Sequence, residues 1–188
     1  MLYSNVADYI IVIKNALTHP LCDAILEEFK NSDEWQDTIV GSGNVEKKIR
    51  NCETVVISYP HIIEKNNKIR LKLDKYIFAS ASKCIQEYNT KHPHCSIEED
   101  SGYELLKYPE GCFYTEHTDS FKARPRAVSC SFILNDDFEG GEFAFFNREH
   151  IHKLGKGDAI MFPSNFMYPH EVMPITKGTR YSIITWFI

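Results

Sequence analysis

Apolar residues in the second half of the chain occur in short runs rich in β-branched and aromatic side chains, which favour strands. The runs lie at 103–108, 113–117, 126–134, 142–146, 158–162, 170–173 and 180–188. Turn residues such as Gly140-Gly141 and Lys177-Gly178 stand between them. Because short turns join antiparallel strands, this half of the chain is predicted to form a sandwich or a jelly roll.

The first hundred residues combine helical and strand patterns. Residues 9–14 predict a short strand, and Thr18-His19-Pro20 predicts the start of a helix that ends near Asn31. Residues 36–40 and 52–58 predict two more strands. The segment between these strands contains glycines and lysines, so we expect an exposed, mobile loop that could cover a site.

A long helix is predicted over 62–88, because apolar residues recur there with helical spacing. The stripe consists of Ile69, Leu73, Ile77, Ala81, Cys84 and Tyr88. We expect this helix to lie on a sheet. The predicted fold class is therefore mostly β with supporting helices. Residues 1–188 are expected to form one domain, in which 1–100 supply helices, strands and a lid and 101–188 supply the jelly-roll core.

Composition and charge exclude several classes of protein. The 188 residues are 43% hydrophobic and 25% charged, which is ordinary for a globular domain. The formal net charge of -5 argues against a protein that coats nucleic acid, although a small basic patch remains compatible with it. No stretch is long and apolar enough to span a bilayer, and no basic segment precedes the first apolar run. We therefore expect a soluble, cytoplasmic protein that binds neither membrane nor nucleic acid.

The cysteines and two histidine clusters do not indicate a structural metal or a disulfide framework. The six cysteines are scattered and form no CxxC pair, so we expect reduced thiols. The clusters are His92-Pro93-His94-Cys95 and His150-Ile151-His152. Neither has a second ligand pair at the spacing of a zinc finger, so solvated turns are the favoured interpretation.

His117-Thr118-Asp119 places two metal-ligand side chains on one face of a predicted strand. The motif alone is weak, because such pairs occur by chance. His170, at the start of a later strand, offers a third ligand. Two imidazoles and one carboxylate suit non-haem Fe(II) and leave three coordination positions open. A structural zinc would need a fourth protein ligand, for which the sequence offers no strong candidate.

Arg180 is the candidate for binding an anion. We expect it on the strand that follows His170, with its side chain in the same cavity. A guanidinium there can bind a carboxylate through two parallel hydrogen bonds. Alone, a surface position after the Lys177-Gly178 turn would be favoured. The apolar residues after Arg180 favour a buried cation with a partner instead.

These residues belong to a longer pattern. The segment from Tyr108 to Asp119 resembles the Y-x-x-G-x-x-Y-x-x-H-x-D signature of 2-oxoglutarate- and Fe(II)-dependent dioxygenases, in particular the prolyl 4-hydroxylase-like branch. Further resemblances to that branch lie at 132–135, Gly140-Gly141-Glu142, 157–163, 170–172 and 180–186. In the N-terminal half the resemblance is limited to the helix start near Pro20 and to Arg50-Asn51-Cys52.

The resemblance implies a double-stranded β-helix, the cupin-like form of the jelly roll. Iron would be held by His117, Asp119 and His170, and 2-oxoglutarate would chelate the metal while its far carboxylate meets Arg180. Tyr108 is expected to hydrogen-bond that carboxylate or its surroundings. Ser129 is a candidate hydroxyl donor to the co-substrate.

One position departs from the family pattern. Ile133 stands where some relatives have a tyrosine. The co-substrate pocket is therefore only partly assigned.

The activity implied is hydroxylation of a C–H bond, with succinate and CO2 as co-products. The cofactors implied are Fe(II), 2-oxoglutarate and O2, with ascorbate as a further candidate. Because Asp119 is present, no coordination position opens for a halide, which argues against a halogenating relative.

The first hypothesis for the substrate is a prolyl residue in a peptide or protein. Arg50, Tyr114 and Trp186 are the candidate substrate contacts, and Arg50 lies in the predicted lid over 40–51. Alternatives are a free amino acid, another small metabolite or a nucleobase. A non-catalytic jelly-roll sensor of metal or 2-oxoglutarate belongs to a different class. No feature of the sequence indicates the oligomeric state.

Overall fold

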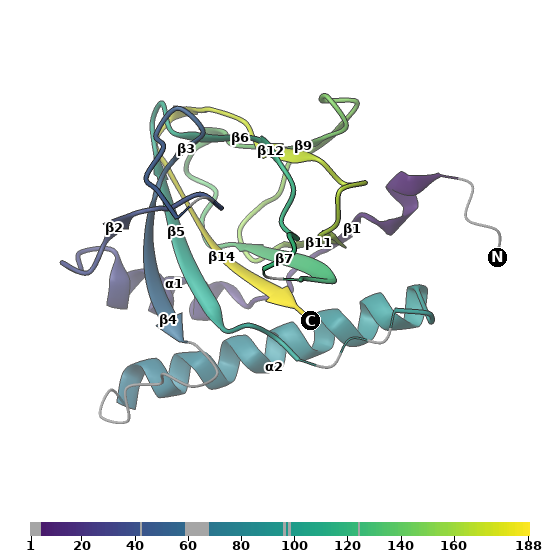
Figure 1. The fold of residues 1–188 in the computed structure, drawn as a ribbon. Helices are drawn as coiled ribbons and strands as arrows, with labels where there is room; N and C mark the ends of the chain where they lie inside the picture. The colour runs from purple at the N-terminus through teal and green to yellow at the C-terminus, as the bar shows by residue number, and fades with distance from the viewer. Residues whose placement is uncertain (1–4, 42, 59–67, 96, 98, 124) are drawn as a thin grey trace.

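Two antiparallel sheets face each other across a gap, and the helices lie outside one of them (Figure 1). The computed structural model describes residues 5–41, 43–58, 68–95, 97, 99–123 and 125–188. The larger sheet, here called the major sheet, has the strand order β1 (Ile11–Ile13), β11 (Ala159–Pro163), β7 (Val128–Ile133), β14 (Thr179–Phe187), β5 (Tyr103–Pro109), β4 (Glu53–Ser58) and β2 (Gln36–Asp37).

The second sheet, here called the minor sheet, carries shorter strands. Its order is β10 (His150–His152), β9 (Phe143–Phe145), β12 (His170–Val172), β6 (Phe113–His117) and β3 (Arg50–Asn51). A small ribbon pairs β13 (Ile175–Lys177) with β8 (Glu139–Gly140). Because β2, β3 and β4 come from the first hundred residues, the N-terminal part of the chain supplies strands to both sheets.

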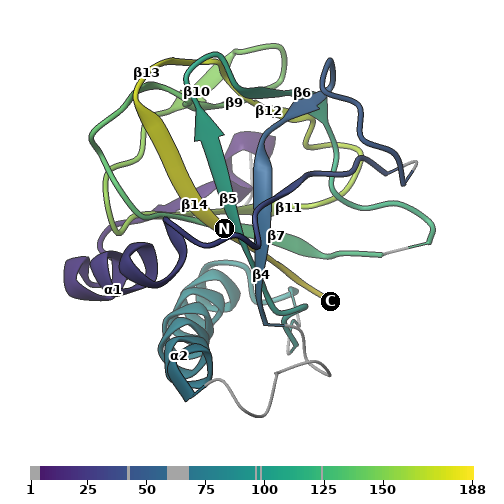
Figure 2. The same ribbon diagram turned by 90° about the vertical axis from the view of Figure 1, so that its left-hand side faces the viewer.

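The helices cover the outer face of the major sheet, as predicted (Figure 2). A short 3-10 helix, η1 (Val6–Tyr9), precedes α1 (His19–Phe29), and α2 spans Lys68–Lys91. The N-cap of α1 is Thr18, whose hydroxyl accepts a hydrogen bond from the Leu21 amide. In the described ranges, no helix has the length and apolar character needed to cross a membrane.

Most of the predicted apolar stripe of α2 is buried against the sheet, from Leu73 to Tyr88. Ile69 was predicted in this stripe, but 56% of its surface is exposed. A helix turns by about 100° per residue, so Ile69 lies roughly 80° around the axis from Ile77 and misses the sheet. Residues 62–67 of the predicted helix lie outside the described residues.

Alternation along the strands divides the side chains between two cores. On β14, Tyr181, Ile183 and Phe187 face the helices, whereas Ile184 and Trp186 face the gap between the sheets. Arg180 shares the parity of the second group. Strand β14, in the middle of the major sheet, therefore also places a charged side chain between the sheets.

The predicted strands of the C-terminal half are confirmed to within one or two residues, the usual uncertainty of strand ends. The sequence analysis missed β8, β10 and β13. Arg180 therefore lies two strands after His170, with β13 between them. The strand predicted over 9–14 is shorter, because Tyr9 ends η1.

One of the two histidine clusters differs from the predicted solvated turns. Around Pro93 and His94 the chain does form an exposed turn, closed by a hydrogen bond from the Cys95 amide to the His92 carbonyl oxygen. Residues His150–His152 instead form β10, which pairs with β9 in the minor sheet. His92 is buried, and its ring stacks on Tyr9 with a centroid distance of 4.6 Å. Neither cluster belongs to a metal-ligand group among the described residues.

Packing of α2 on the major sheet is testable by truncating its most buried residue. Ile77 is fully buried, so Ile77→Ala should lower the free energy of unfolding by about 2–5 kcal/mol. Ile69→Ala on the same helix is the matched control and should change it by less than about 0.5 kcal/mol. Urea denaturation measures both. Equal effects of the two variants would show that this face of α2 does not pack on the sheet.

Candidate metal centre and adjoining cavity

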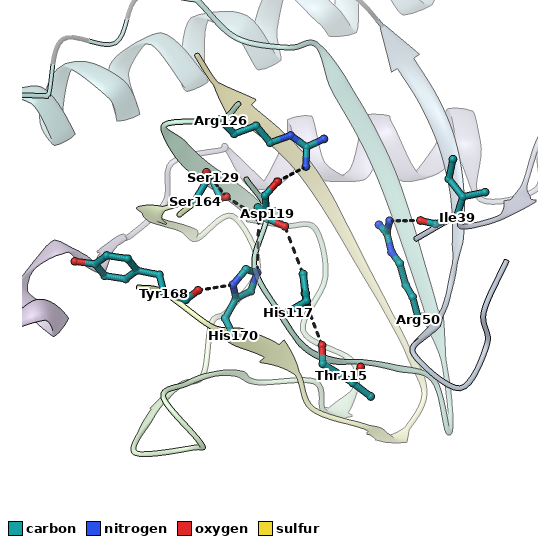
Figure 3. Close-up of polar contacts among 10 residues, drawn as sticks. All are labelled: Ile39, Arg50, Thr115, His117, Asp119, Arg126, Ser129, Ser164, Tyr168 and His170. Carbon is teal, nitrogen blue, oxygen red and sulfur yellow. Dashed lines mark hydrogen bonds and ion pairs between the residues drawn. The ribbon is translucent and has the colours of Figure 1, made fainter. Parts of the chain in front are cut away.

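Three potential metal ligands converge at the edge of the gap between the sheets (Figure 3). His117 ends β6 and His170 begins β12, and the two residues are direct partners in the antiparallel register. Asp119 follows β6 by two residues. The ligand atoms of all three side chains lie within 4.8 Å of one another. His117 and His170, which lie far apart in the sequence, are thus brought together by the pairing of two short strands.

Hydrogen bonds to the backbone set the orientation of both imidazoles. Nδ1 of His117 lies 2.8 Å from the carbonyl oxygen of Thr115, and Nδ1 of His170 lies 3.1 Å from that of Tyr168. A carbonyl only accepts, so each Nδ1 donates its proton and each Nε2 keeps a lone pair. Both Nε2 atoms face Asp119, at 3.4 Å from Oδ1 for His117 and 3.7 Å from Oδ2 for His170.

Burial keeps His170 neutral. Loss of solvation, followed by the nearby His117, lowers the pKa of His170 to about 4. The neutral imidazole is the form that binds a metal. Aromatic rings surround the pair: Tyr114 stacks on His117 at 3.5 Å, and Phe162 packs edge-on to His170 at 4.5 Å.

Asp119 is a buried carboxylate that accepts a hydrogen bond from a neighbouring hydroxyl. The Ser129 hydroxyl donates to its Oδ2 at 2.6 Å, and Ser164 lies 2.8 Å from the same hydroxyl. Burial alone would raise the pKa of Asp119, but His170, His117 and the Ser129 hydrogen bond outweigh it and hold the pKa well below its usual range. The group is therefore ionised and fixed in direction.

This donor set fits a divalent metal ion with open coordination positions. Two neutral imidazoles and one carboxylate are the facial triad that suits non-haem Fe(II). In the described part of the chain no other group of three such side chains gathers this closely, and no fourth ligand joins this one. A closed tetrahedral zinc site is therefore not built among these residues.

Arg180 provides a second polar group in the same cavity. Its side chain is 1% exposed, and its Nη1 donates to the Ser182 hydroxyl at 2.9 Å. Its Nε and Nη2 are buried without a hydrogen-bond partner. The rings of Tyr108 and Phe143 lie 5.3 and 5.2 Å from the guanidinium carbon.

A buried guanidinium with two unpaired N–H donors is energetically unfavourable by itself. Burial also lowers the pKa of Arg180. A carboxylate that accepts from both donors would compensate this cost. The site therefore fits an anionic group, as the metal triad fits a cation.

A cavity of about 680 Å³ connects these groups. The metal triad and Arg180 both line it, together with the inward-facing residues of β4, β5 and β14 and the segment around β2 and β3. Its charged and aromatic lining includes Arg50, Glu104, Tyr108, Tyr114, Arg126 and Trp186. The volume exceeds that of a small dicarboxylic acid, so space remains for part of a second reactant.

Comparison with known proteins assigns the part of the chain that carries these groups. Residues 103–188 match the family model of the 2OG-Fe(II) oxygenase superfamily. The match agrees with the resemblance of the sequence motifs to 2-oxoglutarate- and Fe(II)-dependent dioxygenases over this range.

Curated relatives of the chain include PKHD-type hydroxylases. One from Idiomarina loihiensis is 36% identical over 88 residues, covering 44% of this chain and 39% of the relative. One from Acaryochloris marina is 35% identical over 106 residues, covering 51% of this chain and 48% of the relative. The chain thus spans less than half the length of these two relatives.

Solved structures show the same fold for nearly the whole chain. A prolyl hydroxylase from Trichoplax adhaerens, in complex with a hypoxia inducible factor oxygen degradation domain peptide fragment, has a TM-score of 0.80 at 20% identity and covers 96% of this chain and 84% of its own. A prolyl-4-hydroxylase from Pseudomonas putida has a TM-score of 0.73 at 22% identity and covers 95% and 92%. The expected jelly roll is confirmed.

Most of the predicted site residues line the cavity. Tyr108 is the register partner of Arg180 across β5 and β14, and its hydroxyl is hydrogen-bonded to Cys52. Arg50 lies over the Tyr114 ring at 4.8 Å and donates from Nη1 to the carbonyl of Ile39 at 3.2 Å. Trp186 lines the cavity, and its Nε1 is buried without a hydrogen-bond partner.

Ser129 lies elsewhere than expected. It was predicted as the hydroxyl donor to the co-substrate, but its hydroxyl contacts Asp119 and Ser164, and it does not line the cavity. Ser182 is the hydroxyl that contacts Arg180. The reason is register: Ser182, two residues after Arg180, lies on the same face of β14, whereas Ser129 pairs with Trp186 at the other end of that strand.

Two further residues, Arg126 and Glu104, line the cavity, and of these only Glu104 was missed. Arg126 stacks on Trp186, with its guanidinium carbon 3.4 Å from the ring centroid, and donates from Nη1 to the carbonyl of Asp119 at 3.1 Å. Glu104 faces the cavity from β5. The parity of Tyr108 on β5 would have predicted Glu104, since both lie on the inner face. No signal in the sequence predicts the stacking of Arg126.

The hydrogen bond from Ser129 to Asp119 gives a testable prediction. Ser129→Ala removes the donor that fixes the carboxylate and should lower the affinity for Fe(II) or Co(II) by about 10- to 100-fold. Ser131→Ala, on the same strand and face, is the control and should leave metal affinity unchanged, because the hydroxyl that contacts Asp119 is that of Ser129. Anaerobic metal titration followed by absorption measures both. Equal affinities of the two variants would contradict this role.

Proposed function

We propose that the chain is an Fe(II)- and 2-oxoglutarate-dependent hydroxylase that acts on a prolyl residue of a peptide or protein. The observation that carries this proposal is the shared cavity: a His-Asp-His triad and a buried arginine with two idle donors open into it together. A 2-oxo diacid has two ends that match these two sites. The superfamily of residues 103–188 uses the same pair of cofactors, by its name.

Each cofactor has residues in the chain to hold it. His117, Asp119 and His170 would hold Fe(II) through two Nε2 atoms and a carboxylate oxygen. Bound there, Fe(II) supplies the oxidation chemistry in which O2 and 2-oxoglutarate yield succinate, CO2 and a hydroxylated C–H bond. Arg180 binds the far carboxylate through Nε and Nη2, while Ser182 keeps Nη1 in place.

The protein side chains and backbone orient the metal ligands and exclude water, and they take no part in the electron transfer. Ser129 and the backbone carbonyls of Thr115 and Tyr168 hold the three ligands in direction. The rings of Tyr108 and Phe143 flank Arg180 and keep water from its free donors. A dry site strengthens the hydrogen bonds to the co-substrate carboxylate.

A peptide substrate is supported by the size and rim of the cavity. Exposed apolar side chains line its mouth, including Ile39, Ile49 and Phe121. The stacked pair of Arg126 and Trp186 and the stacked pair of Arg50 and Tyr114 offer flat surfaces and donors to a chain segment. The names of the solved neighbours, one of them bound to a peptide, agree with this substrate class.

We further propose that residues 1–188 act as one domain. The strands β2, β3 and β4 from the N-terminal part extend both sheets, and residues 36–41 together with Gly43, Ile49 and Arg50 line the cavity. This supports the role of the first hundred residues as scaffold and lid.

Turnover tests the proposed activity directly. The purified chain with Fe(II), 2-oxoglutarate and O2 should form succinate, and a proline-containing peptide should gain the mass of one oxygen atom. Removing the metal with a chelator, or replacing its ligand in Asp119→Ala, should abolish succinate formation, because two histidines alone hold the ion weakly. Turnover by Asp119→Ala equal to that of the wild type would refute the assignment of the ligands.

The substrate class is read from the same assay. Oxygen gain on free amino acids but not on peptides would favour a small-molecule hydroxylase. Binding of Fe(II) and 2-oxoglutarate without succinate under any substrate would favour a sensor.

Replacing the proposed carboxylate ligand gives a quantitative prediction. Arg180→Gln removes the charge and should raise the KM for 2-oxoglutarate at least about tenfold, since each charge-assisted hydrogen bond contributes roughly 1.5–3 kcal/mol. Arg148→Gln removes an arginine on the surface and is the control. Succinate formation at varied 2-oxoglutarate measures both. An unchanged KM in Arg180→Gln would place the carboxylate elsewhere.

A further inference from the structure

Two adjacent glycines follow β8, and their surroundings differ. Both have a left-handed backbone, with φ of +79° at Gly140 and +69° at Gly141. A methyl group on Gly140 would collide with the backbone, at the Pro174 carbonyl and the Thr176 amide. A methyl group on Gly141 would meet side chains instead: Cδ1 of Ile175, and Cδ of Arg180 at 2.9 Å.

The Gly140 contacts explain a requirement of the fold. Gly140 pairs with Ile175 where β8 meets β13, so the ribbon cannot form if either backbone is pushed away. Gly141 has no such backbone contact among its nearest neighbours. Its missing side chain therefore leaves space for the side chain of Arg180.

The space at this point matters because Cδ of Arg180 carries the guanidinium. The guanidinium is held on its other sides by the Ser182 hydroxyl and by the rings of Tyr108 and Phe143. Behind it, the free volume next to the glycine turn is only about 10 Å³, roughly that of one water. A side chain pushed at Cδ has little room to yield there, so its Nε and Nη2 must change direction.

We propose that Gly141 is a positioning residue for Arg180: the absence of a side chain lets the guanidinium lie where its two free donors meet the far carboxylate of 2-oxoglutarate. The inference rests on the proposed function, because it concerns the co-substrate of that reaction. Gly141 does not touch the co-substrate; it acts through Arg180.

The test compares Gly141→Ala with Gly111→Ala. Gly111 has a φ of +80° and nothing within 4 Å of the position of an added methyl group, so its variant carries the same backbone strain without the collision. Calorimetry measures the Kd of 2-oxoglutarate for the Mn(II)-loaded protein without O2. Gly141→Ala should raise this Kd at least about tenfold, and Gly111→Ala should change it less than about twofold.

Three further measurements separate positioning from general damage. The affinity for Mn(II) should be equal in the wild type and Gly141→Ala, because the metal ligands are not touched. The Kd of 2-oxopentanoate, which lacks the far carboxylate, should also stay within about twofold. In an Arg180→Gln background, Gly141→Ala should add no further loss of 2-oxoglutarate affinity, because the residue through which it acts is gone.

The outcomes separate failure of the inference about Gly141 from failure of the proposed function on which it rests. If the wild type binds no 2-oxoglutarate with Mn(II) present, the proposed function fails. If the wild type binds it and the two alanine variants behave alike, or if the losses in the double variant add, only the role of Gly141 is refuted.

Failure of Gly141→Ala to fold is resolved by a second variant. Adding Ile175→Val removes the Cδ1 atom that the new methyl would meet and leaves the contact with Arg180. This double variant should fold, as judged by thermal unfolding, and should show the same loss of 2-oxoglutarate affinity. If it does not fold either, Gly141 serves the fold as Gly140 does, and the inference is overturned.

Discussion

Burial of opposite charges without direct contact is the constraint on which the site depends. Asp119 is ionised and buried at one place in the gap between the sheets, and Arg180 is buried at another with two donors idle. Buried charges are costly unless partners compensate them. The Ser129 hydroxyl, which donates a hydrogen bond to Asp119, compensates its charge only in part. The fold thus holds two charges that a cation and a dicarboxylate together would neutralise.

The register of the strands determines where these charged side chains lie. His117 and His170 meet because β6 and β12 pair at those residues, and Arg180 meets Tyr108 because β14 pairs with β5. Alternation then sends these side chains into the gap while their neighbours pack under the helices. A slip of one residue in β14 would turn Arg180 out of the cavity and put Tyr181 in its place. The long pairing of β14 with β5 and β7 protects the site from such a slip.

Much of this could be predicted from the sequence, and the failures have physical causes. The strand pattern predicted the jelly roll, and the motif at 108–119 together with His170 at the start of a later strand predicted the three candidate ligands, because both depend on local order and on residue types. The partner of Ser129 could not be predicted, since it depends on which strand face meets the loop after β6. His92 was assigned to a solvated turn because its burial comes from Tyr9, which is far away in the chain. Short strands such as β10 carry too few residues for a clear period.

The central claim is that one iron ion binds to His117, Asp119 and His170 with coordination positions left open toward Arg180. X-ray diffraction at the iron absorption edge, from anaerobic crystals grown with Fe(II) and 2-oxoglutarate, tests it most directly. The account predicts a single anomalous peak at bonding distance from both Nε2 atoms and the Asp119 carboxylate, with 2-oxoglutarate extending from it to the Arg180 guanidinium. A peak bound by other residues, or 2-oxoglutarate lying away from Arg180, would contradict it.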